Sequence, residues 1–125
     1  MTGPYICTVP WAPPSFNVYN NWKPCQQREQ KRLWQHAVSG LVNQKGNVAP
    51  RGLARAEVKA VIQFTTDRGR DLDNYYDPMW KWTLDALRAA GVLVNDTDKH
   101  VLPHVPKLVL GDVEQTVIMI LEVRE

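Results

Sequence analysis

Two aspartates separated by a single residue, Asp71 and Asp73, are the strongest candidates for chemistry in this sequence. Side chains two positions apart in an extended segment project to the same side of the chain. Two carboxylates held this close repel each other unless a positive charge lies between them. A hard divalent cation that prefers oxygen ligands, Mg²⁺ or Mn²⁺, meets that need. The pair therefore suggests a metal site, although an Asp-x-Asp pair by itself is more often part of a solvated loop.

Cationic side chains around the pair strengthen the metal interpretation. Arg68 and Arg70 flank it, and Lys81 follows early in the next predicted helix. Carboxylates for a metal, placed beside cations for phosphate groups, are what the hydrolysis of a phosphodiester requires. A third acid, Asp96, comes after that helix and can reach the pair only if the helix packs back along a sheet. These residues predict metal-assisted attack on a phosphodiester.

The elements that must position these residues follow from the spacing of apolar side chains. Alternation predicts strands, a three- to four-residue period predicts helices, and three prolines between positions 10 and 14 predict an extended loop that continues to position 24. Asp77 is expected to cap the second helix, with Pro78 at its first position. The predicted strands cover 5–9, 56–66, 99–110 and 114–124, and the predicted helices cover 26–43 and 78–90. The order predicts one α+β domain over residues 1–125, a small mixed β-sheet of about four strands with two helices packed on it.

Composition narrows the class of protein. The chain has 125 residues, 44% of them hydrophobic, which is enough for one core. The two cysteines lack the spacing of a zinc site, and no apolar run reaches the roughly 20 residues that span a bilayer. No secretory signal is evident, so we expect a cytoplasmic protein without membrane contact. We also expect no small-molecule cofactor. The net charge of +2 is too small to indicate nucleic acid by itself, but the cations gather in the middle of the chain.

Four short motifs resemble those of the RusA-type Holliday junction resolvases. The first is RDLDN at 70–74, which is similar to the RDxDN motif of that family. Residues 81–87 resemble the KxxxDAL segment of the family, and residues 90–96 resemble its AGhhxDD stretch, in which h is an apolar residue. Residues 9–15 resemble its LPWPPS-like segment. The matches occur in the same order as in the family and cover most of the chain.

The resemblance implies a function, a cofactor and a set of site residues. Proteins of this family are homodimeric, Mg²⁺-dependent endonucleases that resolve four-way DNA junctions with paired nicks, and phages or prophages often encode them. Mn²⁺ is a possible substitute for Mg²⁺. Carried over by position, the resemblance implies metal binding by Asp71, Asp73 and Asp96, a catalytic role for Lys81, and contact with DNA by Arg68, Arg70 and Asn74.

Two departures from the family pattern leave alternatives open. The insertion at 75–78 lengthens the spacing between Asp73 and Lys81, so the register of Lys81 is less secure. Asp77 is therefore either a helix cap or an additional acid of the site. The paired acids expected after the second helix stand here as Asn95 and Asp96, which retains the acid that the resemblance assigns to the metal.

Other functions fit parts of the sequence. A non-catalytic protein that binds branched DNA, with a repurposed acidic site, is the main alternative to an endonuclease. A nucleotide-sugar transferase also uses an Asp-x-Asp pair, but the chain lacks a Rossmann-like half. A structural interaction module remains a third possibility. Among the tryptophans, Trp34 and Trp80 are expected in the core, whereas Trp22 and Trp82 are candidates for contact with DNA or a dimer partner.

Overall fold

The computed structural model describes residues 3–67, 69–70, 72–95, 97 and 99–123, with only the backbone for Leu72, Asp73 and Pro103. Its elements along the chain are β1 (Tyr5–Val9), α1 (Phe16–Asn21), α2 (Pro24–Val42), β2 (Ala56–Phe64), the 3₁₀ helix η1 (Leu72–Tyr75), α3 (Met79–Ala89), β3 (Val101–Pro103), β4 (Lys107–Leu110) and β5 (Gln115–Glu122). The α+β class expected from the sequence is confirmed.

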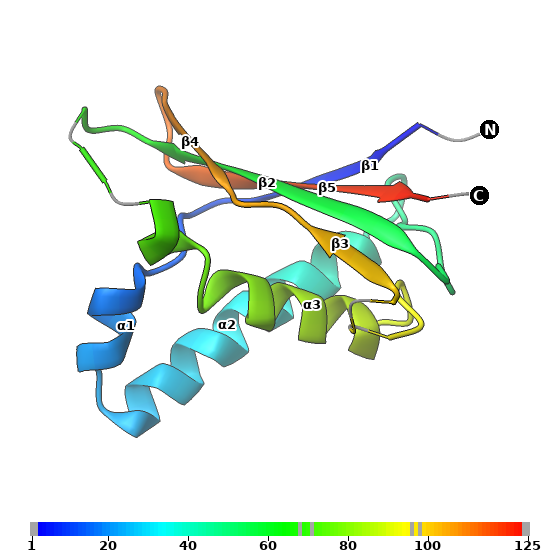
Figure 1. Cartoon of the computed structure of the whole chain (residues 1–125), viewed down its shortest axis with the longest axis horizontal. Helices are drawn as coiled ribbons and strands as arrows, with labels where there is room; N and C mark the ends of the chain where they lie inside the picture. Colours follow the sequence, from blue (N-terminus) through cyan, green and yellow to red (C-terminus); the bar gives the residue numbers. More distant parts are fainter. Residues whose placement is uncertain (1–2, 68, 71, 96, 98, 124–125) are drawn as a thin grey trace.

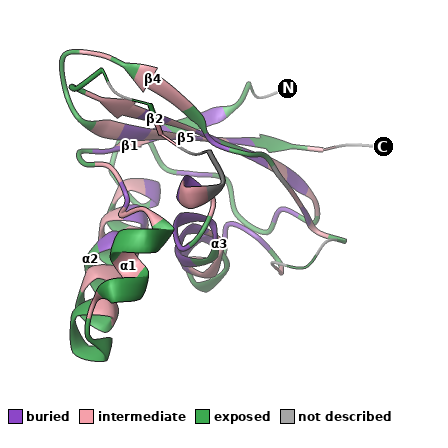
Figure 2. Ribbon diagram, turned by 60° about the vertical axis from the view of Figure 1, so that its left-hand side comes forward, coloured by how far each residue is buried: buried purple, intermediate pink, exposed green. Residues whose placement is uncertain are grey.

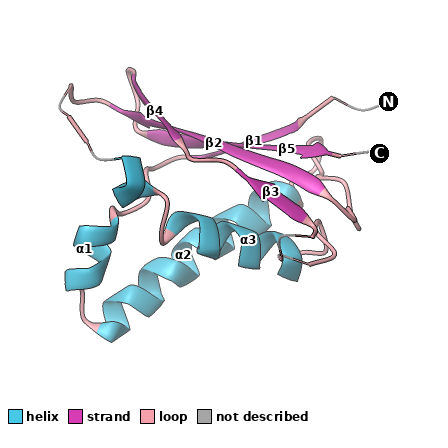
Figure 3. Cartoon of the chain, viewed as in Figure 1, coloured by secondary structure: helices cyan, strands magenta, loops and turns pink. Residues whose placement is uncertain are grey.

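The strands form one mixed sheet (Figures 1 and 3). Its order is β1-β5-β2-β3, and β4 continues beside β2 where β3 ends. The long central strands β2 and β5 are antiparallel, as are β5 and β1, whereas β3 and β4 both run parallel to β2. The sheet therefore has five described strands instead of the four expected, and three α-helices accompany it instead of two.

All the described helices lie on one side of the sheet (Figure 1). The side chains that alternate toward them are buried: Tyr5, Cys7, Val9, Val58, Ala60, Ile62, Ile118 and Ile120. No described helix covers the opposite face, where Ile6 is 44% exposed and Leu121 is 36% exposed. The single core thus lies between the sheet and the helical layer, as the burial colours of Figure 2 show.

Helix α2 anchors the helical layer through one apolar stripe. Pro24 opens the helix at a position where its missing N–H costs no intrahelical hydrogen bond. Trp34, Val38 and Val42 are fully buried, in agreement with the predicted stripe. Leu33 was expected on the same stripe but is 40% exposed, because it lies about 100° around the helix from Trp34.

The short helix α1 corrects the expectation of a loop before α2. Ser15 caps it, because the Ser15 hydroxyl accepts a hydrogen bond from the Val18 N–H at 3.2 Å. The helix buries none of its residues completely and is only six residues long. An apolar period cannot develop over so short and so exposed a segment, so only the capping serine signals the helix in the sequence.

The segment predicted as one strand over 99–110 forms two, β3 and β4. Pro103 and Pro106 lack backbone N–H donors, so the ladder cannot continue through them. Between them, the His104 N–H still donates to the Val58 carbonyl at 3.2 Å. Both short strands still pair with the same neighbouring strand, β2.

The two cysteines lie in contrasting environments. Cys7 is buried in the core, and this burial raises the pKa of its thiol to about 11, whereas Cys25 is exposed. Because the thiolate is the reactive form, we expect a thiol reagent at pH 8 to label Cys25 rapidly and Cys7 only when the protein unfolds. Labelling followed with and without urea measures this. A Cys25→Ser variant should show the slow phase alone, and equal rates for both thiols in the folded protein would contradict the buried position of Cys7.

Candidate active site

The chain leaves β2 at Phe64 and turns toward η1 through a segment held by Arg70. The Arg70 guanidinium carbon lies 3.8 Å from the centre of the Phe64 ring. Its two terminal nitrogens donate to the backbone carbonyl and the hydroxyl of Thr66, at 3.1 and 2.8 Å. Phe64 also meets Tyr75 edge to face, with ring centres 5.3 Å apart. Arg70 therefore folds back over the end of β2 and lies beside the start of the acidic segment.

The 3₁₀ helix η1 and α3 carry the next residues of the motif. Asp73 lies in η1 by its backbone, and Asn74 beside it is half-buried. Tyr75 is buried, which fixes the end of η1 against the sheet. Lys81 lies near the start of α3 with its side chain exposed.

Helix α3 begins differently from the prediction. Pro78 takes the N-cap position, with Met79 as the first helical residue, and no side chain caps the helix. Asp77 precedes the N-cap and makes no capping hydrogen bond, so it is not the expected cap, and it is exposed. The helix is instead fixed by burial and by the Trp80 indole N–H, which donates to the His104 carbonyl at 2.8 Å. This leaves the exposed Asp77 carboxylate four residues before Lys81.

Trp82 also differs from the expectation that it contacts DNA or a partner. It is 3% exposed and belongs to the core. Tyr19 of α1 packs edge to face on it, with ring centres 5.5 Å apart. Trp34 and Trp80, at 1% and 2% exposure, confirm the prediction for those two. Trp82 was misjudged because α1, which was not expected, covers the side of α3 on which it lies.

Three of the predicted site residues, Arg68, Asp71 and Asp96, lie outside the described residues, and so does the side chain of Asp73. Their described neighbours locate the two ends of the motif. Arg70 and Leu72 follow the last residue of β2, whereas Val94 donates its N–H to Leu53, just before the first residue of β2, at 3.1 Å. The described residues therefore place the chain beside Asp71 and the chain beside Asp96 near opposite ends of β2 (Figure 1).

The length of α3 explains this separation. An eleven-residue helix is about 16 Å long, and the nine-residue strand β2 is about 30 Å long. Helix α3 packs along the sheet, which the convergence of the three acids requires. However, η1 precedes one end of this helix and Asn95 follows the other end, so the length of α3 separates them. In the described fold, η1 with Asp73 and Asn74 comes shortly before the start of α3, which carries Lys81. The chain that follows α3 reaches the other end of β2, where Val94 meets Leu53.

Comparison with family models and with curated proteins finds no match for this chain. The resemblance therefore rests on the four motifs. In the described part of the chain, no group of three His, Cys, Asp or Glu side chains is placed to hold a metal ion, and the three candidate acids are not among the side chains described. No helix within the described ranges is long and apolar enough to cross a membrane.

The helical layer contains a feature that sequence reasoning missed. A groove of about 510 Å³ opens between α2 and α3, and its walls carry Lys31, Arg32, Asp85 and Arg88. The period of each helix indicates which residues are exposed, but it does not indicate that the two exposed faces adjoin. A helix pair packed side by side on one sheet face was predictable, so the groove could have been sought between them.

Proposed function

We propose that this protein is a Mg²⁺-dependent, structure-selective DNA endonuclease that resolves four-way junctions by paired nicks. The observation that carries the proposal is the RDLDN segment at 70–74, which lies where the chain turns from the end of β2 into η1 and α3. In the sequence this segment contains two acids and an amide, and the exposed Lys81 follows near the start of α3. Such a combination supports chemistry on a phosphodiester.

The oxygen donors of this segment suit a hard divalent cation. In the proposal Asp71 and Asp73 hold Mg²⁺, which would supply charge neutralisation and activation of a water molecule against the phosphodiester. The Lys81 ammonium, exposed near the start of α3, stabilises the negative charge that develops on the phosphate. Asn74 and Arg68 orient the DNA backbone by hydrogen bonds and charge.

Arg70 takes a positioning role in this proposal. Its contacts with Phe64 and Thr66 fix the chain one residue before Asp71. Asp96 remains the third acid because the resemblance assigns it to the metal. The described chain around it gives this assignment no geometric support, since Asn95 lies beyond the far end of α3.

A four-way junction has twofold symmetry and needs two cuts, so a homodimer suits this substrate. The sheet face that no described helix covers supports such a dimer. It presents Ile6, Met119 and Leu121 as partly exposed apolar side chains on the neighbouring strands β1 and β5. Apolar side chains are enriched in homodimer interfaces, which bury roughly 800 Å² or more of surface on each protomer.

The deciding experiment compares a labelled four-way junction with a linear duplex of the same sequence, in Mg²⁺ and in EDTA. We expect symmetric nicks on the junction alone, and their complete loss when EDTA removes the metal. Equal cleavage of the duplex would contradict structure selectivity. Junction binding without cleavage in Mg²⁺ and in Mn²⁺ would instead identify the protein as a non-catalytic binder of branched DNA.

A further inference from the structure

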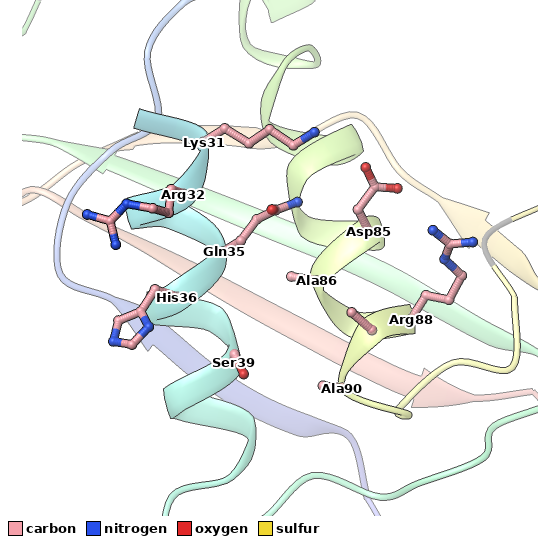
Figure 4. Close-up of a pocket in the computed structure, with 10 residues that line it drawn as sticks. Lys31, Arg32, Gln35, His36, Ser39, Asp85, Ala86, Arg88 and Ala90 are labelled. Atoms are coloured by element: carbon pink, nitrogen blue, oxygen red, sulfur yellow. The ribbon is translucent and has the colours of Figure 1, made fainter. Parts of the chain in front are cut away.

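The α2–α3 groove lies on the side of the helical layer that faces away from the sheet (Figure 4). Figure 4 shows Lys31 extending from α2 across the groove toward α3, and Asp85 rising from α3. Arg88 lies farther along α3, with its guanidinium directed away from α2. Arg32 projects from the side of α2 that faces away from α3 and stands at the edge of the groove. The groove is therefore a surface channel that Lys31 crosses, with Arg32 and Arg88 at its two edges.

Its walls are fixed by hydrogen bonds between the two helices. The Gln35 amide nitrogen donates to the Trp82 carbonyl at 3.1 Å. Beneath it, the buried Trp34 indole N–H donates to the Thr83 hydroxyl at 3.0 Å. These bonds set the spacing of α2 and α3, so the groove is part of the packed structure.

The helical layer carries more positive charge than the molecule as a whole. The whole chain has a net charge of +2. Segments 23–45 and 79–90 contain only two acids, Glu29 and Asp85, against the cations Lys23, Arg28, Lys31, Arg32, Lys45, Lys81 and Arg88. Acids therefore outnumber cations elsewhere in the chain, and the positive potential is concentrated on the layer that contains the groove.

The composition of the groove favours an anionic polymer over a protein partner. Protein interfaces concentrate aromatic and large apolar side chains at their centre. The apolar residues that line this groove are all alanines, Ala86, Ala89 and Ala90, and its other lining residues are polar or charged. Polar, positively charged surfaces are typical of contacts with a phosphate backbone.

We propose that the groove between α2 and α3 binds the phosphate backbone of DNA, with Lys31, Arg32 and Arg88 as the contacting cations. Arg32 forms an exposed ion pair with Glu29 of the same helix, and exposed pairs are weak enough to be exchanged for a phosphate. The identity of the ligand as DNA rests on the proposed function. The groove itself lies apart from the acidic segment at 71–73.

The course of α3 connects the groove with the proposed site of cleavage. Lys81, Asp85 and Arg88 follow one another at four- and three-residue steps, so they share one side of the helix. A backbone that lies in the groove and follows this side runs toward Lys81, next to η1. The groove would then hold one arm of the junction while another part of the same DNA reaches the acids.

The test measures binding of a labelled junction in EDTA over a range of salt concentrations. The Lys31→Ala/Arg88→Ala variant is expected to bind about tenfold more weakly at low salt, and its plot of log affinity against log salt is expected to be shallower by about two. Lys107→Ala, an exposed lysine on β4, is the matched control and is expected to bind as the unmodified protein does. An unchanged salt dependence in the double variant would overturn the proposal.

A second variant separates this proposal from a general loss of structure. Asp85→Asn removes the acid that lines the groove, so it is expected to tighten DNA binding a few-fold, which a damaged fold cannot do. Weaker or unchanged binding would overturn the proposal. Millimolar inorganic phosphate and polyglutamate are expected to compete poorly; equal competition by phosphate would indicate a small-anion site, and equal competition by polyglutamate an acidic protein partner.

Failure of the proposed function gives a different result. Binding of the junction through Lys31 and Arg88 without any cleavage would support the groove proposal and refute the proposed endonuclease activity. Cleavage of the junction by the unmodified protein, with normal binding by both groove variants, would support the endonuclease activity and refute the groove proposal.

Discussion

Replacing Asp73 with asparagine is expected to abolish junction cleavage, lowering the rate by on the order of a thousandfold or more. Asparagine has nearly the same size but no charge, so it removes half of the proposed carboxylate pair without removing its shape. Metal-assisted charge stabilisation contributes several kcal/mol to such reactions, and each 1.4 kcal/mol changes the rate about tenfold. The measurement is the initial rate of nicking of a labelled four-way junction in Mg²⁺.

Asp77→Asn is the matched control, because Asp77 is an exposed acid of the same segment that caps no helix. This variant is expected to keep most of the cleavage rate, and both variants are expected to unfold at the temperature of the unmodified protein. A normal rate in Asp73→Asn would refute the metal pair. A loss confined to Asp77→Asn would move the site to the alternative register, in which Asp77 stands four residues before Lys81.

Part of the candidate site was predictable because local geometry follows from local sequence. The turn out of β2, the helix that carries Lys81 and the exposure of Lys81 all follow from alternation and helical period over 56–66 and 78–90. The course of the chain after α3 was not predictable in the same way. It depends on the parallel pairing of β3 with the start of β2, which is a tertiary contact that no local pattern records.

The same limit applies to the fold. The long alternating strands β2 and β5 lie where the sequence predicts them, because each buries one face against the helices. The apolar residues of segment 99–110 continue through Pro103 and Pro106 and so predict one strand, whereas the two prolines divide the segment into β3 and β4. Helix α1 has no apolar period, and its position over Trp82 is a tertiary contact that no local pattern records.

Replacing Trp34 with alanine is expected to cause the largest loss of stability of any single change considered, about 3–5 kcal/mol in the free energy of unfolding. Trp34 is 1% exposed in the core, and its indole N–H donates to the buried Thr83 hydroxyl at 3.0 Å. The change removes a large apolar side chain and leaves that hydroxyl without its donor. Since domains of this size are stable by roughly 5–15 kcal/mol in total, urea denaturation will show a large shift of the midpoint.

Two further tryptophan variants separate the contributions to this effect. Trp34→Phe keeps an aromatic ring in the core but cannot donate to Thr83, so a smaller loss of about 1–3 kcal/mol is expected. Trp22→Ala removes a half-buried side chain beside Tyr19 and is expected to cost less than Trp34→Ala. Equal losses for Trp22→Ala and Trp34→Ala would contradict the packing of α2 on α3. Because the same packing forms the α2–α3 groove, a destabilised Trp34→Ala protein that still folds in the cold is also expected to bind junction DNA less tightly.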